Sequence, residues 1–598
     1  MSACISWRTY DEQYKLSELL TDAARACVDV HASEPKEYLA SYFVKACRGD
    51  AVEELYCEPL LTPEGEVGVG LHLRLFTNVE AHTATTRIGP QSQGAERDEG
   101  AIAANSSHTD HHVIALNFIE HLAHDFLPQL QQIGCSAQEE WDAVVVKGKD
   151  TVTWPSHVLS LAAAIAAAKS MRLSLYQHIR ALYLKTLLAE DIINCNPVTL
   201  DADALFFMPQ LVIPFFGSVL DRHTATGSIY IHTLYLLPGV SATSVSDIKR
   251  DRVVSAELLC KIGSAYRVLA KRRGTNTSSH ATVALPTVRE DGAYILDCPL
   301  ESVVDAVALA SEVLQQVGIK PGKEVCFGVR LQCPKVQRSV PEGSTGTIFA
   351  THGLKEASIG KKQVSSGPRK KPFHHSAGGT PDIMYSLHPG DTDVTGAQVA
   401  LYLSQQVEKA GGTLVYLEDT HTAQDEEGLH RLQGILKEQY DWKGIVSGYG
   451  LYDCQDKQYD LEERISAGIQ RVWSQNLALC PDTVGSITRL MRLGQTIRMG
   501  GRAISMVQVP HVRPAEAVVD LAVGTGTSFL ILSSLQLPSA CEVVSRFLSM
   551  QSSLLRARSL GEPPAWGIFF PKDLPAVPKD IVIPEIRRKN DKKRKAGK

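Results

Sequence analysis

The residues with the clearest potential for chemistry are carboxylates that follow a short apolar run. Val415–Leu417 is followed directly by Glu418 and Asp419, and three more acids stand at 425–427. Carboxylate oxygens at strand ends can hold a hard cation or move protons. Such a cation normally takes carboxylates from several strands, so the chemistry of Glu418 depends on the residues at the other strand ends.

A histidine-rich stretch, His108–His112, could also bind a metal ion, with His121 and His124 one turn apart further on. The cluster matches no ligand spacing of a known zinc site. We therefore prefer a polar loop in which Ser106 or Ser107 caps a helix whose wetter face carries His121 and His124.

The segment Val519–Thr527 resembles superficially the first motif of an S-adenosylmethionine methyltransferase. A doubly wound domain would need several more βα units after this motif. Only about 70 residues follow, and they end in a basic tail. The methyltransferase interpretation is therefore disfavoured.

Length and composition indicate a globular protein of more than one domain. The chain has 598 residues, of which 44% are hydrophobic and 21% charged, with a net charge of -5 and a basic end at Arg587–Lys598. No apolar run of about 18 residues and no signal peptide is found, so we expect a cytoplasmic protein with no membrane contact. The 13 cysteines lack CxxC spacing, which predicts reduced thiols rather than disulfides or a zinc site.

Two helices are expected at the N-terminus. Apolar residues recur at helical spacing over 12–30, and a second helix from Pro35 places four side chains on one face, Tyr38, Leu39, Tyr42 and Phe43. The pattern resembles the Dpy-30 and RII-type modules, in which two such hairpins form a four-helix bundle that docks an amphipathic helix. A packing extension on the next domain is an equal alternative.

The remaining chain reads as an α+β domain followed by a barrel. Apolar and other residues alternate over 66–76, which predicts a strand with one buried face. The stretch 113–130 is amphipathic, and the stretch 155–168 predicts a buried helix. From 205 to 570, short apolar runs alternate with helical patterns, as a parallel (β/α)8 barrel requires.

These patterns divide the chain into a helical hairpin, an α+β domain, an α/β barrel with a flexible insertion, and a basic tail. Their ranges are 1–60, 61–200, 201–570 with the insertion at 332–382, and 571–598.

Several strand ends and turns resemble motifs of the enolase family in order and spacing. They are the Glu-Asp-Pro strand at Val415–Asp419, the catalytic-lysine strand with its Ile-Gly-Ser at Leu477–Thr488, the Ala-Asp-Leu-Val-Val-Gly segment at Val518–Gly524, the Met-Ile-Leu-Pro strand at Leu236–Pro238, and the Leu-Tyr-Arg-His-Ile turn at Leu175–Ile179. The resemblance spans roughly residues 60–570. With its extra hairpin and insertion, the chain is similar to the divergent sperm-type branch of that family.

The resemblance implies an enolase-like (β/α)8 barrel with a small α+β domain, and a site where two magnesium ions and a lysine base act. Of the metal positions, Glu418 is kept, whereas Arg330 replaces an aspartate and Tyr449 stands on the third strand. A cation in a metal cage repels the ion. At the other positions, Thr233 replaces an acid, Cys480 replaces the lysine base and Ile531 replaces a second lysine. The His-Arg-Ser segment that binds the substrate phosphate in the family is replaced by Gln508, Val509 and Pro510. His223 is the candidate for a retained loop histidine.

Three functions remain open. We favour a catalytically degenerate scaffold that needs no cofactor, and the resemblance places it in the axoneme of a cilium or flagellum. It would act through the N-terminal hairpin, as a homodimer or within a larger assembly, with the basic tail on an acidic partner such as tubulin. The alternatives are an active, magnesium-dependent phosphopyruvate hydratase of glycolysis and a metabolite-sensing binder. In the degenerate site, Arg330 could pair with an anion or with Glu418, which would fill the metal position without a ligand.

Overall fold

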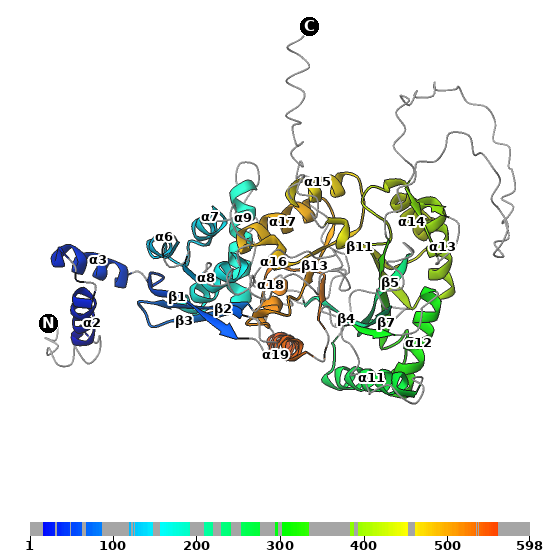
Figure 1. The fold of residues 1–598 in the computed structure, drawn as a ribbon, viewed down its shortest axis with the longest axis horizontal. Helices are drawn as coiled ribbons and strands as arrows, with labels where there is room; N and C mark the ends of the chain where they lie inside the picture. The colour runs from blue at the N-terminus through cyan, green and yellow to red at the C-terminus, as the bar shows by residue number, and fades with distance from the viewer. Residues whose placement is uncertain are drawn as a thin grey trace, which may run out of the picture.

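The computed structural model describes residues 16–61, 67–85, 119–147, 156–191, 208–218, 229–240, 253–275, 293–296, 302–333, 383–387, 393–452 and 461–559, apart from positions 30, 32, 48, 121–123, 125, 534 and 536. Two N-terminal helices, a small sheet with its helices, and a large barrel follow one another along the chain (Figure 1). His223, the histidines at 108–112, nearly all of the predicted insertion and the basic tail lie outside the described residues.

The N-terminal helices form as the sequence predicts. Helix α2 spans Leu16–Asp29 and α3 spans Pro35–Cys47, with Pro35 as the first helical residue. Both lie at the far left of Figure 1, away from the barrel. The pair meets the rest of the chain through α3.

Tyr42 of α3 packs against its own chain. It is 7% exposed, and its ring meets Phe76 edge-to-face with the centroids 4.9 Å apart. Tyr38, Leu39 and Phe43 are partly buried. Tyr42 therefore packs on the chain that follows the two helices, and whether the hairpin docks a partner stays a prediction.

A four-stranded antiparallel sheet forms the small domain, in the order β1-β2-β3-β14. The strands are β1 (Val52–Leu61), β2 (Val67–Leu75), β3 (Glu80–Thr85) and β14 (Val512–Arg513). The alternation at 66–76 correctly predicted β2. The sequence interpretation missed β1, which falls inside the proposed hairpin domain 1–60 except for Leu61, because the register shift between Val52 and Glu54 breaks its alternation.

Helices cover one face of this sheet. They are α6 (Leu127–Leu130), α7 (Gln138–Lys147) and α8 (Ser156–Ser170), and the next helix, α9 (Leu175–Asp191), packs on α18 (Ala517–Thr525) of the barrel. Helix α8 packs on β2 and β3 and is buried along most of its length, which confirms the buried helix predicted at 155–168. Much of the helix predicted at 113–130 lies outside the described residues, and α6 covers its end.

Eight strands close into a barrel, since β15 pairs with both β13 and β4. In order around the barrel they are β4 (Gln210–Ser218), β5 (Tyr230–Pro238), β7 (Val325–Gln332), β10 (Leu414–Glu418), β11 (Ile445–Gly448), β12 (Asn476–Leu479), β13 (Ala503–Val507) and β15 (Phe529–Ile531). The ninth strand of the sheet, β6 (Tyr294–Leu296), adds to β4 outside the closed ring. The predicted α/β barrel is thus present.

Strand β5 departs from the expected all-parallel barrel. It runs antiparallel to both neighbours, β4 and β7, whereas the other barrel pairs are parallel. Only residues 219–229 separate β4 from β5, which is less than a parallel crossover with its helix requires. The short connection therefore reverses β5 and brings its first half beside the carboxyl end of β7.

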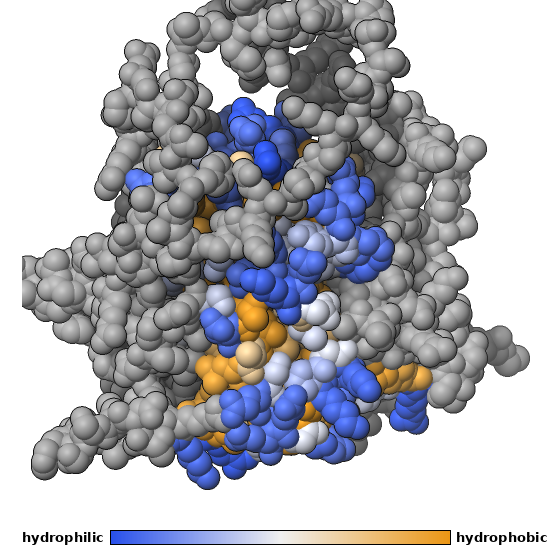
Figure 2. Space-filling view, turned by 90° about the vertical axis from the view of Figure 1, so that its right-hand side faces the viewer, coloured by the Kyte–Doolittle hydropathy of each residue, from blue (hydrophilic) through white to orange (hydrophobic). Residues whose placement is uncertain are grey.

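Helices surround the barrel. They are α11 (Ala256–Thr275), α12 (Val303–Gln316), α13 (Gly396–Lys409), α14 (Glu426–Glu438), α15 (Leu461–Gln470), α16 (Pro481–Val484), α17 (Ile487–Met499), α18 (Ala517–Thr525) and α19 (Pro538–Ser559). Figure 2 faces the side on which α11 to α14 lie and shows apolar residues bordered by hydrophilic ones. Because most of Val519–Thr527 lies in helix α18 rather than in a strand and glycine loop, the methyltransferase interpretation is wrong.

The small domain caps a helix of the barrel. Asp142 of α7 accepts a hydrogen bond from the backbone N–H of Thr488 at 2.9 Å, and Ser160 of α8 accepts one from Ile487 at 2.9 Å. Both donors belong to the first turn of α17, whose amide groups have no partner inside the helix. The two parts are therefore joined by buried, directional contacts.

Candidate functional site

The positions singled out for chemistry gather at one end of the barrel. Glu418 ends β10 and pairs in register with Arg330 of β7, which in turn pairs with Thr233 of β5. Tyr449 follows β11 directly. Three of the predicted strand ends are therefore true neighbours at the barrel mouth, as the shared edge of parallel strands requires.

Arg330 pairs with Asp419 at this mouth. Its Nε donates to Asp419 Oδ2 at 3.0 Å, and its guanidinium lies 4.6 Å from the centre of the Tyr449 ring. A guanidinium over an aromatic face is attracted by the ring quadrupole. Burial alone would lower the pKa of Arg330, but the nearby acidic groups, Asp419 above all, raise it above its ordinary value. Arg330 is thus held as a permanent cation.

The backbone after β11 completes the coordination of Asp419. Oδ1 accepts from the N–H groups of Tyr449 at 2.8 Å and Leu451 at 3.3 Å, and Oδ2 accepts from Gly450 at 2.9 Å. Asp419 adopts φ 55°, a conformation that is uncommon for non-glycine residues. Each carboxylate oxygen therefore has two donors, counting Arg330.

Glu418 lies deeper in the barrel and accepts from two tyrosines. The Tyr235 hydroxyl donates to Oε2 at 2.9 Å, and the Tyr416 hydroxyl lies 2.9 Å from Oε1 and also 2.9 Å from Ser447 Oγ. All four side chains are buried. Glu418 is therefore enclosed by its own barrel rather than presented to solvent.

The protonation of Glu418 reflects this enclosure. Burial and the neighbouring Asp419 carboxylate raise the pKa of Glu418 to about 7, against the opposing effects of Arg330 and the tyrosine hydrogen bonds. Burial likewise raises the pKa of Tyr416 well above its usual value. Glu418 therefore takes up and releases its proton near neutral pH, whereas the Tyr416 hydroxyl stays protonated there.

A hydrogen-bonded layer continues from Glu418 across the barrel interior. Asn476 of β12 donates through Nδ2 to Ser447 Oγ at 2.7 Å and to Ser505 Oγ at 2.6 Å. These residues stand on three consecutive parallel strands, and all are buried. The interior near the mouth is therefore filled with mutually bonded polar side chains, which leave little room for a substrate.

The other predicted positions lie near their strand ends in structural roles. Cys480 is buried and precedes α16. Gln508 ties β13 to β15: its backbone N–H donates to the Ile531 carbonyl at 2.8 Å, and its Oε1 accepts from the N–H of Ser533 at 3.0 Å. Val509 and Ile531 are buried, and Pro510 is partly buried.

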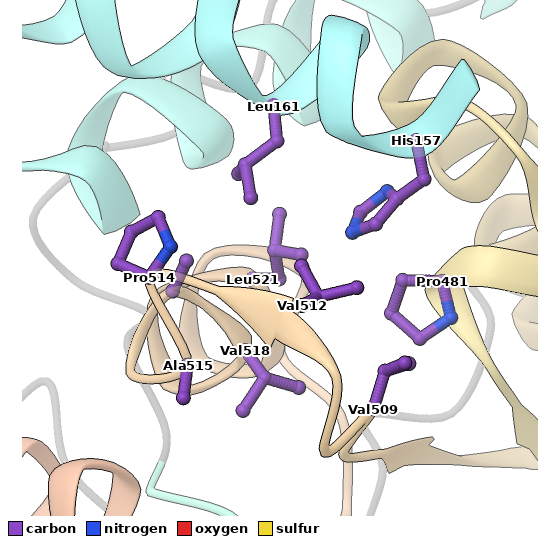
Figure 3. Close-up of a pocket in the computed structure, with 10 residues that line it drawn as sticks. His157, Leu161, Pro481, Val509, Val512, Pro514, Ala515, Val518 and Leu521 are labelled. Carbon is purple, nitrogen blue, oxygen red and sulfur yellow. The ribbon is translucent and has the colours of Figure 1, made fainter. Parts of the chain in front are cut away.

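Figure 3 shows a small cavity between α8 and the segment that follows β13. Its volume of about 20 Å3 is enough for about one water molecule. His157 and Leu161 approach it from α8, and Val509 lies across from them. Burial lowers the pKa of His157 to about 4, so this ring is neutral at pH 7. Neither Glu418 nor Arg330 lines this cavity, so it is separate from the barrel mouth.

The side chains at the barrel mouth do not form a site that fits magnesium. A hard cation needs free carboxylate oxygens, yet the oxygens of Asp419 are filled by three N–H groups and Arg330, and those of Glu418 face two tyrosines. The Arg330 guanidinium would repel the ion. Across the part of the chain that the structure describes, no three His, Cys, Asp or Glu side chains are placed to hold a metal ion.

The structure corrects one pairing and adds three residues to the site. Arg330 forms its ion pair with Asp419 and not with Glu418. Asp419 was visible in the sequence as part of the Glu-Asp pair, but nothing there indicated its turn toward the backbone. Tyr235 and Tyr416 were missed because alternation identifies inward positions without saying which of them reach the mouth.

The comparisons with known proteins add no family. No protein-family model matches the chain, and no curated protein matches it. Among the described helices, none on its own is long and apolar enough to cross a membrane, although α8 and α9 satisfy those criteria together across a bend of 105°.

Proposed function

We propose that this chain is a catalytically degenerate enolase-fold protein with a scaffolding role. The observation that carries the proposal is that, at the barrel mouth, Asp419 accepts four hydrogen bonds, one of them from Arg330, while Glu418 accepts from two tyrosines. An active site needs groups that remain available to substrate, metal or proton. Here these groups are engaged by the protein itself, which disfavours an active hydratase and a metabolite sensor at this mouth.

The catalytic part of the proposal is tested with 2-phosphoglycerate and magnesium. Titration calorimetry of the purified protein should show no heat of binding, and the absorbance of phosphoenolpyruvate should not rise. A competent enolase in the same buffer serves as the positive control. Any turnover is examined again with Glu418→Gln: a rate that falls with this substitution arises at the barrel mouth and contradicts the proposal, whereas an unchanged rate indicates a contaminant.

The scaffolding part assigns contacts to the two ends of the chain. We place the protein in the cytoplasm, in the axoneme of a cilium or flagellum, on the strength of the sequence resemblance. Leu20 and Val28 of α2 are 46% and 67% exposed, so α2 offers apolar surface for a second copy or a partner helix. The basic end, Arg587–Lys598, suits an acidic surface such as that of tubulin.

Self-association through α2 is tested by sedimentation velocity. Leu20→Glu should shift the protein toward monomer, because a carboxylate cannot be buried in an apolar contact without cost. Leu401→Glu is the matched control, since Leu401 is 40% exposed but lies on α13 of the barrel. Equal sedimentation of both variants and the parent would contradict a contact through α2.

The tail contact is tested by co-sedimentation with microtubules. Replacing the four consecutive basic residues at 592–595 by glutamine should abolish binding, and added salt should weaken binding of the parent. Leu20→Glu keeps the tail and serves as the control. Binding that survives the loss of these charges would remove the tubulin assignment.

A further inference from the structure

The outward face of the small sheet brings two histidines together. His72 of β2 and His82 of β3 are directly opposite each other in antiparallel register. Their Nδ1 atoms lie 2.6 Å apart. Leu71 and Leu73, on either side of His72, are buried in the core, so His72 faces outward as the two-residue period of a strand requires.

The other nitrogen of each ring faces a carboxylate. His72 Nε2 lies 2.8 Å from Glu58 Oε1, and His82 Nε2 lies 3.5 Å from Glu80 Oε2. An ionised carboxylate only accepts hydrogen bonds, so the 2.8 Å contact with Glu58 favours the tautomer of His72 that carries its hydrogen on Nε2. A neutral imidazole has a single N–H. His72 Nδ1 then presents a lone pair to His82 Nδ1, and the two atoms at 2.6 Å can share either a hydrogen or, after a small separation, a metal ion.

We infer that His72 and His82 form a two-histidine site for a divalent transition-metal ion such as Zn2+, Ni2+ or Cu2+. Neutral imidazole is a preferred ligand for these ions. Glu58 accepts from Nε2 of His72, the arrangement that fixes the tautomer and orientation of a metal-bound histidine, and Glu80 lies 3.5 Å from Nε2 of His82. Their two negative charges also balance the charge of the ion.

The geometry needs only a small adjustment. Zinc to imidazole distances are about 2.0–2.1 Å, which in a tetrahedral site separates two nitrogen ligands by about 3.3 Å. The rings must therefore move apart by less than about 1 Å. The His72 and His82 side chains are 25% and 55% exposed and have room to do so. Tyr56 of β1 stacks on the His72 ring with the centroids 4.7 Å apart, which supports its plane.

Two protein ligands leave the remaining coordination positions to water. Among the described residues, no three or more His, Cys, Asp or Glu side chains are grouped to hold a metal ion, and the proposed site has only two protein ligands. It is expected to bind more weakly than a closed structural zinc site. Because protons compete for the same nitrogens, binding should weaken as the pH falls. The competing arrangement is a single proton shared between the rings, with no metal bound.

Calorimetry with Zn2+ on the full-length protein tests the site. We expect a binding event that is at least about tenfold weaker, or lost, in both His72→Gln and His82→Gln, since each removes half of the chelate. His31→Asn is the matched control: it removes an exposed histidine in a turn with φ 49°, a conformation that asparagine tolerates. Zinc binding by thiols is common to the parent and all three variants.

Electron paramagnetic resonance with one equivalent of Cu2+ gives a second readout on the unmodified protein. The spectrum of the parent should show coupling to two imidazole nitrogens, and the spectrum of His72→Gln should show coupling to only one. Isotherms that are unchanged in both glutamine variants overturn the site. Sensitivity to only one of the two substitutions also overturns it, because a single surface histidine would then be the ligand.

Discussion

Replacing Glu418 by glutamine should change how stability depends on pH. The pKa of Glu418 rises from 4.5 to about 7 in the folded protein because the carboxylate is buried beside Asp419. Between these values the folded protein keeps a proton that the unfolded chain has released. The free energy of unfolding therefore falls as the pH rises through this window, and the loss is complete above about pH 7.

The expected magnitude follows from the size of the pKa rise. A shift from 4.5 to about 7 corresponds to a loss of about 3 kcal/mol in the free energy of unfolding. About 1 kcal/mol of this loss is already present at about pH 5, so about 2–3 kcal/mol is lost between about pH 5 and pH 8.5. Glutamine does not ionise, yet it keeps an oxygen that can accept from Tyr235. Glu418→Gln should therefore gain about 2–3 kcal/mol relative to the parent over this range.

Urea unfolding at the two pH values, followed by circular dichroism, measures this difference. Glu438→Gln is the matched control, because Glu438 is exposed on α14 and should follow the parent at both pH values. The reasoning is refuted if Glu418→Gln also follows the parent. That result would mean that the carboxylate is solvated in solution and that the two tyrosines do not enclose it.

Two further substitutions test the packing that supports the site. Asp142→Ala removes the side chain that caps α17, so we expect a loss of about 1–2 kcal/mol in the free energy of unfolding. The Thr488 amide, which loses its acceptor, should exchange its hydrogen faster. An unchanged exchange rate would contradict the cap. Gly524→Ala should cost about 1–3 kcal/mol, because the added Cβ would lie 2.6 Å from Ile179 Cγ2. Gly434→Ala has nothing within 4 Å and serves as its control, and equal thermal midpoints of the two variants would refute the clash.

The sequence predicted the fold best where the pattern is local. The alternation at 66–76 identifies β2, and the apolar content of 155–168 identifies α8. In both, the pattern of apolar residues within the element shows which side chains are buried. Strand β1 was missed because its bulge breaks the alternation. The direction of β5 could not be read from its residues, because direction depends on the connection that precedes the strand.

The sequence predicted which residues meet at the barrel mouth but not which of them form the ion pair. Arg330, Glu418 and Tyr449 were expected to meet because ends of parallel strands share one edge. The choice between two adjacent carboxylates was decided by the backbone, since φ 55° at Asp419 turns that side chain toward the amides that follow β11. Glu418 instead continues inward, where reversed β5 supplies Tyr235. Both facts arise from tertiary geometry.

The charges at the mouth compensate one another, and this limits what the barrel can bind there. Arg330 carries one positive charge and Asp419 one negative charge in direct contact, while Glu418 is neutral below about pH 7 and negative above it. The charge of the Arg330 guanidinium is already balanced by Asp419, which weakens its attraction for a phosphorylated substrate. A divalent cation would meet Arg330 first and gain Glu418 only by displacing tyrosine hydrogen bonds. The same contacts that stabilise the mouth therefore oppose binding of a metal ion and of a phosphorylated ligand there, and this is the physical argument for the proposed scaffolding role.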